Sequence, residues 1–431
     1  MEKSSNKPLL LGGIGDDFTG SAELAAMMVQ QGVAASLVTT PAAVATAPGH
    51  AIVVAHKSRV APADQAVTAT LASARALRAR GARQLFFKYC ATFDSTPKGN
   101  IGPCADALLD LVGATQTAYC PAFPEVARTV YQGHLFFADR LISESSKRHD
   151  PLTPMTDPDL QRVLQAQTPH RVGLLPRNVI VAGDDAVRAH VARLAADGVR
   201  HVIADSTDES DLQAVARLTV DWPLMTGGSS VAVYYPDQWR ARGLLDGTAA
   251  APALPAVQGH GLVLAGSCSE RTLEQLAAFG TDHPVLRLDL LAAASDRDRA
   301  VADAIDWAAD RLDRGPVAIA TSEGPEAVSR VQAQLGVGGA AGLAEGLLGR
   351  IARALVDRGV RRLMIAGGET SGAVVEALGL ETFQVGAYQG AGISRMVTDD
   401  PAGRHLALCL KSGKLGPTDM FATVLAAMTR E

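Results

Sequence analysis

The chain alternates short apolar runs with longer stretches of helical periodicity, and this alternation restricts the possible folds more than any other feature. In its first part the apolar runs Leu9–Ile14, His50–Ala55 and Gln84–Lys88 are each followed by a helical pattern. Short apolar runs between helices are typical of the buried strands of a parallel sheet, because the crossover helices cover both of its faces. The helices are expected at Ser21–Gln31, Asp64–Arg80 and Ile101–Leu111.

The alternation is interrupted twice. Tyr119–Pro154 is rich in Pro, Gly and aromatic residues and has little periodicity, which is typical of a long ordered excursion that carries function. Val202–Ala204 then predicts a further strand. Asp246–His260 contains small residues and two prolines without periodicity, so we interpret residues 246–260 as a linker between domains.

After this linker the same pattern restarts. Since 431 residues exceed what one hydrophobic core usually covers, we expect two α/β domains with mainly parallel sheets, residues 1–245 and residues 261–431. The second domain has predicted strands at Leu262–Ala265, Val285–Leu288, Val317–Ala320, Leu363–Ala366 and Leu406–Leu410, and predicted helices at Glu270–Phe279, Arg297–Arg311, Gly342–Arg358 and Ser371–Leu378.

Charge and cysteine content narrow the class of partner. The formal net charge is −5, so the chain has no bulk attraction for nucleic acid or an anionic membrane, and any cations that hold an anionic substrate must be concentrated locally. No apolar run is long enough to span a bilayer, and Met1–Pro8 lacks the apolar stretch of a secretory signal. Five cysteines without a Cys-x-x-Cys pair indicate neither a disulfide framework nor a zinc site, and we expect a cytoplasmic protein.

The first candidate site is GGIGDDFTG at Gly12–Gly20, where a predicted strand runs into Asp16, Asp17 and Thr19. Ligands of open α/β sheets bind at the carboxyl ends of strands. Two adjacent carboxylates there could orient a substrate hydroxyl, accept its proton or hold a metal ion. Alternatively, one of them only caps the following helix. We expect Asp16 to lie closer to the capping position and Asp17 to act as the general base.

The second candidate site is KYCATFDSTPKGNIG at Lys88–Gly102, whose lysines, hydroxyl and amide could grip a carboxylate and several hydroxyl groups. An ordinary polar loop with an Asp or Asn cap is the alternative, although a buried ammonium at Lys88 would need a partner. Further along the chain, Arg140 and Arg162 are candidates for binding an anionic ligand. Taken singly, each of these arginines is more typical of an ordinary surface residue. The substrate-binding candidates are Thr19, Lys88, Asp94, Ser95, Lys98, Asn100 and Arg162.

Three glycine-rich turns follow predicted strands of the second domain: Gly266–Ser269, Gly367–Gly372 and Gly413–Gly416. Backbone N–H groups, hydroxyls and helix N-termini are the usual means of holding phosphate. A single turn of this kind often serves packing alone, but three in one domain predict a nucleotide site. Glu369 could hold Mg²⁺ through water, or it only favours the helix dipole. The candidate nucleotide contacts are Ser267, Ser269, Gly367, Gly368, Glu369, Thr370, Ser371 and Gly413.

The sequence lacks the signature motifs of three other classes of enzyme. No G-x-x-x-x-G-K-[ST] sequence occurs, which disfavours a P-loop kinase, and no G-x-S-x-G elbow suggests a serine hydrolase. GVGGAAG at Gly336–Gly342 resembles a dinucleotide fingerprint, but the preceding Glu326–Leu335 reads as a helix rather than the required strand. A nicotinamide-dependent oxidoreductase is therefore disfavoured.

Six segments, taken in order, carry a resemblance to a known family. They are IGDDFTGSAELA, KYCATFDSTPKGNIGP, PLTPMTDPDL, GSCSERT, AGGETSGAV and LKSGKLG, beginning at Ile14, Lys88, Pro151, Gly266, Ala366 and Leu410. With these segments the chain resembles the four-carbon acid sugar kinase family over nearly its full length. The second segment is most similar to the 3-oxo-tetronate kinase branch.

The resemblance implies a division of labour. The first domain would bind the acid sugar, the second would bind ATP with Mg²⁺, and the active site would lie in the interdomain cleft, which closes to exclude water. The terminal hydroxyl of 3-oxo-tetronate would be phosphorylated to the 4-phosphate. Family substrate residues map onto Asp16, Asp17, Lys88, Asp94, Ser95 and Lys98, and family nucleotide residues onto Ser267, Ser269, Gly367 through Ser371 and Gly413.

Two other readings stay open. The first is a kinase for D-threonate or erythronate, which belongs to a similar branch of the family. The second is a non-catalytic sensor of sugar acids, disfavoured by the intact acidic pair and by all three glycine turns. The expected partners are the small-molecule acid sugar and ATP, without nucleic acid or membrane, and a homodimer is an open possibility for assembly.

Overall fold

The computed structural model describes residues 8–150, 152–247, 251, 253–321, 323–390 and 392–430. The chain divides into two compact units, Met1–Ala251 and Pro252–Glu431. Of the predicted linker at residues 246–260, residues 248–250 and 252 lie outside the described residues, as does Pro151 at the start of the third family segment. No helix of the described residues is long and apolar enough to cross a membrane.

The first unit is built on a parallel sheet with the strand order β2-β3-β1-β4-β11-β5-β10-β9. The predicted strands near Leu9, His50, Gln84 and Val202 are confirmed, whereas β2, β5, β9 and β11 were not predicted. The strands are β1 Leu11–Gly15, β2 Ala35–Val38, β3 Ala51–Ala55, β4 Gln84–Lys88, β5 Thr117–Cys120, β9 Arg171–Leu175, β10 Val199–Ala204 and β11 Leu224–Gly227.

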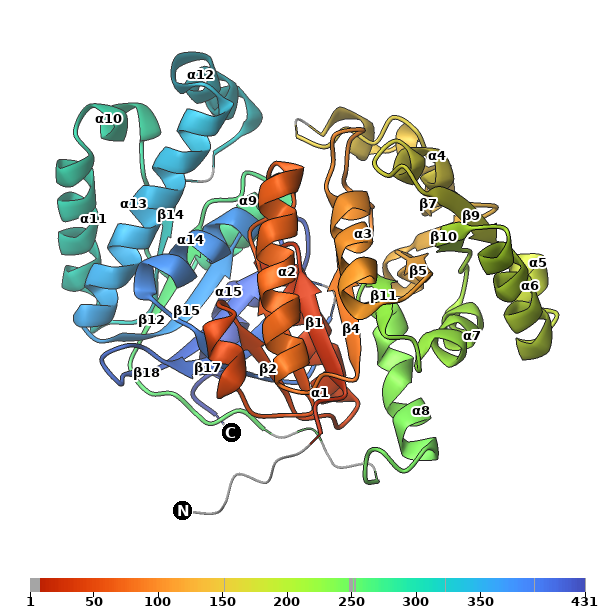
Figure 1. Ribbon diagram of the computed structural model, residues 1–431. Coiled ribbons are helices and arrows are strands. Elements are labelled where there is room, and N and C mark those ends of the chain that lie inside the picture. The colour runs from red at the N-terminus through yellow and green to blue at the C-terminus, as the bar shows by residue number, and fades with distance from the viewer. Residues whose placement is uncertain are drawn as a thin grey trace. The chain divides into compact units, whose positions relative to one another are not determined.

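Crossover helices connect these strands (Figure 1). Helix α1 follows β1 and α2 follows β3, and every residue of β1, β3 and β4 is buried, as the continuous apolar runs required. The helices of this unit are α1 Phe18–Gln30, α2 Ala63–Ala79, α3 Ile101–Val112, α4 Leu160–Gln165, α5 Arg177–Ile180, α6 Asp184–Ala196, α7 Glu209–Thr219 and α8 Tyr235–Ala241.

The register of the sheet places several strand ends side by side. Gly15 at the end of β1 is paired with Ala55 of β3 and with Lys88 of β4, and Gly227 of β11 is paired with Lys88. Because all these strands are parallel, the loops that leave β1, β3, β4 and β11 start from one edge of the sheet. This edge carries the candidate residues of the first unit except Arg140, which lies in β8, and Arg162, which lies in α4.

The excursion after β5 is ordered, as the sequence predicted. Strands β6 (Arg128–Tyr131), β7 (His134–Phe137) and β8 (Arg140–Leu141) form a small antiparallel sheet, and the 3₁₀ turns η3 (Ile142–Glu144) and η4 (Ser146–His149) follow it. Val130 exchanges backbone hydrogen bonds with Ser206, which attaches the small sheet to the loop after β10.

The second unit contains a mixed sheet with the strand order β13-β14-β12-β15-β18-β17-β16, parallel as far as β18 and antiparallel from there. The five predicted strands are confirmed, and the antiparallel strands β16 and β17 were not predicted. The strands are β12 His260–Ala265, β13 Val285–Arg287, β14 Val317–Ala320, β15 Val360–Ala366, β16 Thr382–Val385, β17 Ile393–Asp399 and β18 His405–Lys411.

Helices cover this sheet as well (Figure 1). Helix α13 begins at Val337, so most of the GVGGAAG segment is helical and follows helix α12 rather than a strand, which removes the dinucleotide interpretation. The helices are α9 Glu270–Phe279, α10 Leu290–Ser295, α11 Arg297–Leu312, α12 Pro325–Leu335, α13 Val337–Asp357, α14 Gly368–Leu378 and α15 Met420–Ala427.

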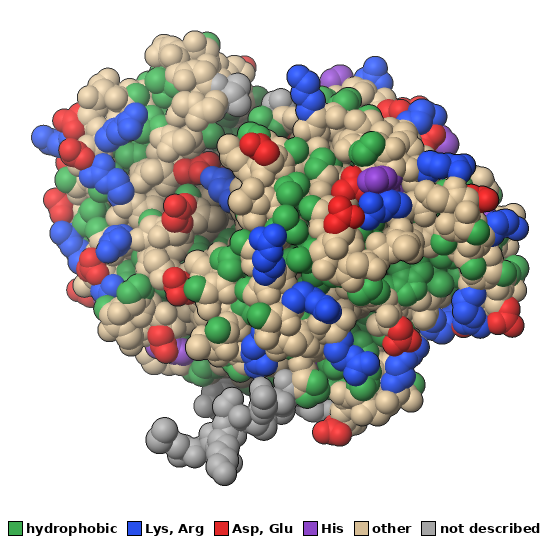
Figure 2. Space-filling model, viewed as in Figure 1, with side chains coloured by type: hydrophobic (Ala, Val, Ile, Leu, Met, Phe, Trp, Pro, Cys, Tyr) green, Lys and Arg blue, Asp and Glu red, His purple; other side chains and the backbone are tan. Residues whose placement is uncertain are grey.

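Charged side chains of both signs are interspersed on the visible face of the molecule (Figure 2).

Candidate functional site

The two adjacent aspartates after β1 have different structural tasks. Asp17 is the N-cap of α1, and its Oδ1 accepts a hydrogen bond of 2.9 Å from Gly20 N–H. Asp16 continues the strand direction: its N–H donates to Lys88 O at 3.0 Å, and its carbonyl accepts from the N–H groups of Ser58 and Arg59. The expectation that Asp16 lies closer to the capping position was therefore wrong, because the strand continues one residue further than the sequence suggested.

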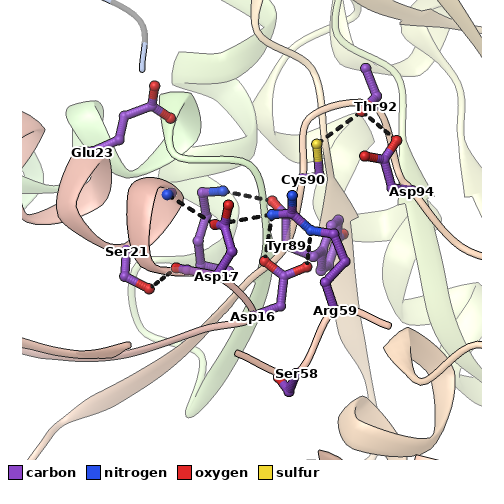
Figure 3. A network of polar contacts seen from close by, with 12 residues as sticks. Asp16, Asp17, Ser21, Glu23, Ser58, Arg59, Tyr89, Cys90, Thr92 and Asp94 are labelled. Carbon is purple, nitrogen blue, oxygen red and sulfur yellow. Dashed lines mark hydrogen bonds and ion pairs between the residues drawn. The ribbon is translucent and has the colours of Figure 1, made fainter. Parts of the chain in front are cut away.

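Arg59, which the sequence analysis missed, joins the two aspartates (Figure 3). Its Nε and Nη2 donate to the two carboxylate oxygens of Asp16, both at 2.9 Å, and Nη2 lies 3.0 Å from Asp17 Oδ1. Such a two-pronged pair fixes the planes of both groups. Arg59 lies in the loop that leaves β3, so the strand-end argument that selected the aspartates could have selected it too.

Asn100 supports this loop. Its Nδ2 donates to the carbonyls of Ser58 and Ala61 at 2.7 and 3.1 Å, and the side chain is buried. The amide therefore positions the loop that carries Arg59. Binding of substrate by Asn100 stays a prediction.

The ion pairs and burial give the two aspartates different electrostatics. Burial raises the pKa of Asp16, against the lowering influence of Arg59, and the side chain is only 4% exposed. Burial would also raise the pKa of Asp17, but the charges of Arg59 and Lys88 and the Gly20 hydrogen bond outweigh it, so this pKa is lowered. Asp17 is 23% exposed. Asp17 is thus an ionised carboxylate that a ligand can reach, whereas both carboxylate oxygens of the buried Asp16 already accept hydrogen bonds from Arg59.

Lys88 is buried at the end of β4 beside the start of α1. Its Nζ donates to Tyr89 O at 2.8 Å, and a Cβ added at Gly20 would lie 2.7 Å from this nitrogen and 2.6 Å from Asp17 Oδ1. Gly20 is therefore required for the close approach of helix, ammonium and carboxylate. The hydroxyl of Thr19, in the same first turn of α1, is buried and has no hydrogen-bond partner among the described residues.

A second cluster of polar contacts is centred on Asp94 in the loop after β4, and Figure 3 shows Asp94 with Thr92 and Cys90. Thr92 Oγ1 donates to Asp94 Oδ1 at 2.6 Å, and Lys147 Nζ from turn η4 donates to Asp94 Oδ2 at 2.7 Å. Burial raises the pKa of the Cys90 thiol, and the charges of Asp94, Arg59 and Lys147 all act on it. The Cys90 thiol, 2.9 Å from Thr92 Oγ1, thus belongs to the Asp94 cluster and also lies within the electrostatic influence of Arg59. Lys147 is a further cation that the sequence analysis missed.

The remaining substrate candidates of the first unit are dispersed. Ser95 is buried and its Oγ accepts a hydrogen bond of 2.8 Å from Gln167 Nε2, whereas Lys98 is exposed. Arg162, 62% exposed on α4, pairs with the carboxylates of its own loop, Asp157 and Asp159, each at 2.6 Å. The structure therefore does not bring Arg162 into the contacts around Asp16 and Asp94.

The carboxyl end of β11 contributes an unpredicted contact to the same sheet edge. Ser229, just after the strand, donates from Oγ to Glu23 Oε2 of α1 at 2.7 Å, and both side chains are buried. Its signal, GGSS at the end of a short apolar run, was available in the sequence.

In the second unit the three predicted glycine turns meet. A Cβ added at Gly266 would lie 2.2 Å from Thr370 Oγ1, and one added at Gly413 would lie 2.0 Å from Ser267 Oγ. Gly367 has a φ of 126° and donates its N–H to Lys411 O at 2.9 Å. Each turn thus touches another one so closely that a larger residue would displace it.

Hydroxyl groups line these turns. Ser269 caps α9 and donates from Oγ to Gly413 O at 2.6 Å, and Ser267 Oγ lies 3.2 Å from Ser269 Oγ. Ser371 Oγ donates to Gly367 O at 2.7 Å. Gly368 and Glu369 begin α14, and the Glu369 side chain is exposed. Among the described residues no group of three or more His, Cys, Asp or Glu side chains could hold a metal ion.

Lys411, at the end of β18, lies behind the turns and was not predicted. It is fully buried, and its Nζ donates to Thr272 Oγ1, Gln275 Oε1 and Gly413 O at 2.9, 2.6 and 2.8 Å. Burial, with a contribution from the charge of Arg271, lowers the pKa of this ammonium to about 8.

Comparison with known proteins establishes the family. Residues 11–235 match a sugar-binding N-terminal domain and residues 262–421 a nucleotide-binding C-terminal domain. The chain is 46% identical to the 3-oxo-tetronate kinase of Burkholderia multivorans, with 99% of each chain covered. The chain belongs to the four-carbon acid sugar kinase family. The 3-oxo-tetronate kinase of Pseudomonas fluorescens is 45% identical, with 98% of each chain covered.

Two solved structures share the fold of this acid sugar kinase. A Salmonella typhimurium LT2 protein, named as a tRNA synthase, is 33% identical with a TM-score of 0.84, and the match covers 96% of this chain and 98% of that one. A Haemophilus influenzae protein of the DUF1537 family is 34% identical with a TM-score of 0.77, over 97% and 100% of the two chains. The family resemblance and the mainly parallel α/β fold predicted from the sequence are both confirmed.

Proposed function

We propose that this chain is an ATP-dependent kinase that phosphorylates the terminal hydroxyl of 3-oxo-tetronate and yields 3-oxo-tetronate 4-phosphate. The observation that carries the proposal is its identity of 44–46% with several 3-oxo-tetronate kinases over nearly their full length. Two groups of side chains in this chain suit the two halves of that reaction.

The first unit supplies groups for the acid sugar. Asp17, ionised and partly exposed, would accept a hydrogen bond from the terminal hydroxyl and take its proton as the new P–O bond forms. A carboxylate of lowered pKa suits late proton transfer, because phosphoryl transfer depends mainly on alignment and charge neutralisation. The substrate carboxylate would form an ion pair with one or more of Lys88, Lys98 and Lys147. Asp94 and Ser95 would form hydrogen bonds with the substrate hydroxyl groups. We assign acid-sugar binding to residues 1–245 on these grounds.

The second unit supplies groups for ATP, and we assign nucleotide binding to residues 261–431. Its glycine turns leave no room for a Cβ at Gly266 or Gly413, and serine and threonine hydroxyls converge on the same place. Such turns fit phosphate oxygens. Mg²⁺ usually binds through one or two carboxylates together with substrate phosphates, and Glu369 at the start of α14 is the acidic side chain of these turns. When bound, the ion would neutralise phosphate charge.

The overall reaction balances without a further reactant. The terminal hydroxyl oxygen bonds to the γ-phosphorus of ATP, the bond to the bridging oxygen of ADP breaks, and the hydroxyl proton passes to Asp17. That one active site forms between the two domains remains a prediction, as does a homodimer. All five cysteines are free thiols, which supports our proposal of a cytoplasmic, reducing environment.

The test is an ATP turnover assay of the purified protein with a panel of four-carbon acids. We expect the highest kcat/KM with 3-oxo-tetronate, and phosphorus NMR should show a phosphomonoester on the terminal carbon. A preference for D-threonate or erythronate would favour the alternative kinase. Binding of acids without any ATP turnover would support the sensor and refute a kinase.

A further inference from the structure

Three donors converge on a single carbonyl oxygen in the turn after β18. Gly413 O lies 2.6 Å from Ser269 Oγ, 2.9 Å from Thr272 Oγ1 and 2.8 Å from Lys411 Nζ. A carbonyl oxygen has two lone pairs, so it is saturated by these groups. The peptide that links Gly413 to Lys414 is therefore held in one orientation.

This orientation determines where the neighbouring N–H group points. In a trans peptide the C=O and N–H bonds are antiparallel, and the described chain contains no cis peptide. With Gly413 O turned towards the buried ammonium, the N–H of Lys414 points away from it. Neither this N–H nor that of Gly413 has an acceptor among the described residues. Two successive unpaired N–H groups in a turn are a feature that suits an anion.

Among the residues that the structure describes, no carboxylate forms a hydrogen bond or an ion pair with the buried ammonium of Lys411. Its acceptors are a hydroxyl, an amide oxygen and a carbonyl. Phe421 of α15 lies with its ring centroid 5.8 Å from Nζ, and the strand neighbours in β15 and β17 are Ala366 and Ile393. The ionisable groups that act on it are Arg271 of α9 and Cys409 of β18.

From these contacts we propose that Lys411 is a positioning residue of the nucleotide site, acting through the Gly413 carbonyl to direct the Lys414 N–H of the β18 turn towards the phosphates of ATP. This inference rests on the proposed kinase function. It gives the buried ammonium two effects: a fixed peptide orientation, and a positive charge behind the turn that favours the anionic nucleotide.

The first test compares ATP binding by calorimetry in wild type and three variants. We expect Lys411→Met to raise the Kd for ATP at least about tenfold, and Thr272→Val, which removes one of the three donors, to raise it in the same direction by about two- to fivefold. The Kd for the acid sugar should stay within about twofold, which a general unfolding would not permit. Arg299→Met is the control variant. Arg299 lies on α11 and is 74% exposed, so its replacement removes one positive charge from the same unit and should leave ATP binding unchanged.

The second test uses the titration of Lys411 itself and needs no change at that residue. If ATP requires the protonated ammonium, whose pKa is about 8, its affinity should fall about tenfold from pH 7 to pH 9. Burial raises the pKa of Cys409 to about 12, outside this window. The last phosphate ionisation of ATP, with a pKa of about 6, is largely complete at pH 7, and its completion at higher pH would strengthen binding to a cation rather than weaken it. The series is run with a Cys268→Ser background, because that exposed thiol lies in the neighbouring turn.

Each result has a definite meaning. A Lys411→Met protein that binds ATP as wild type does, or a wild-type affinity that stays constant to pH 9, would overturn the positioning role. If Lys411→Met does not fold, an unchanged Kd in Thr272→Val would overturn it as well. Failure of wild type itself to bind ATP would instead refute the proposed kinase function, so the two failures are distinguishable.

Discussion

Replacing Arg59 by Met would leave the buried carboxylate of Asp16 without its partner, and the structure allows the cost to be estimated. Arg59 makes two hydrogen bonds of 2.9 Å to Asp16, which is 4% exposed, while Arg59 itself is 23% exposed. Removing one partner of a buried pair typically costs about 3–5 kcal/mol. Because Arg59 is partly solvated, we expect a loss of about 2–3 kcal/mol in the free energy of unfolding at pH 7.5.

The loss should depend on pH with a sign that identifies its cause. Burial already raises the pKa of Asp16, and removing the lowering influence of Arg59 must raise it further. A carboxyl whose folded pKa exceeds its unfolded value destabilises the fold above that pKa, and the penalty disappears as it becomes protonated. The difference in stability between wild type and Arg59→Met should therefore shrink as the pH falls from 7.5 towards 5.

The assay is urea unfolding of wild type and Arg59→Met at pH 7.5 and pH 5, which measures the free energy of unfolding. Two further variants serve as controls. Arg162→Met also removes an arginine paired with two aspartates, but this one is 62% exposed, so little change is expected. Asp16→Asn combined with Arg59→Met removes the unpaired charge and should recover part of the stability. A difference below about 0.5 kcal/mol, or one that is independent of pH, would refute the description of Asp16 as a buried, charge-compensated carboxylate.

Three predictions concern the reaction itself. Asp17→Asn keeps the cap geometry but cannot take a proton, so kcat for 3-oxo-tetronate at saturating ATP should fall about 10²–10⁴-fold, and a kcat within a few-fold of wild type would reject Asp17 as the base. Lys88→Met should raise the KM for the acid sugar at least about tenfold with ATP affinity unchanged; a smaller effect would count against a direct ion pair. Thr370→Val with Gly413→Val should weaken ATP binding, because a Cβ at Gly413 would lie 2.0 Å from Ser267 Oγ; calorimetry showing loss of acid-sugar binding instead would reverse the assignment of the two units.

The sequence predicted those parts of the fold that are encoded by continuous segments. Every residue of β1, β3 and β4 is buried. Strands of this kind appear in the sequence as short apolar runs, and these runs allowed the three strands to be predicted. β11 has the sequence LMTG, and its apolar signal is too short to distinguish it from a loop. The antiparallel pair β16 and β17 departs from the helix-strand alternation on which the prediction depended.

The candidate site shows the same division. The aspartates and glycine turns were found because they directly follow strands, whereas the three missed cations depend on pairings between distant segments. Arg59 is 43 residues from Asp16, Lys147 is 53 from Asp94, and Lys411 is 139 from Thr272. The cap of α1 falls on Asp17 instead of Asp16 for a local reason, because the residue that caps a helix is set by where the strand before it ends.

Each unit has a buried lysine at the carboxyl end of a strand of its sheet. Lys88 is the last residue of β4 and Lys411 the last of β18, both are buried, and each donates to a backbone carbonyl just ahead of it, Tyr89 O and Gly413 O. A buried ammonium is costly unless negative charge comes close. In a chain of net charge −5, two such lysines at the carboxyl ends of strands provide positive potential where anionic substrates are expected to bind. If the substrate carboxylate binds near Lys88 and the nucleotide phosphates bind near Lys411, as we propose, these anions would offset part of the cost of burying the two lysines.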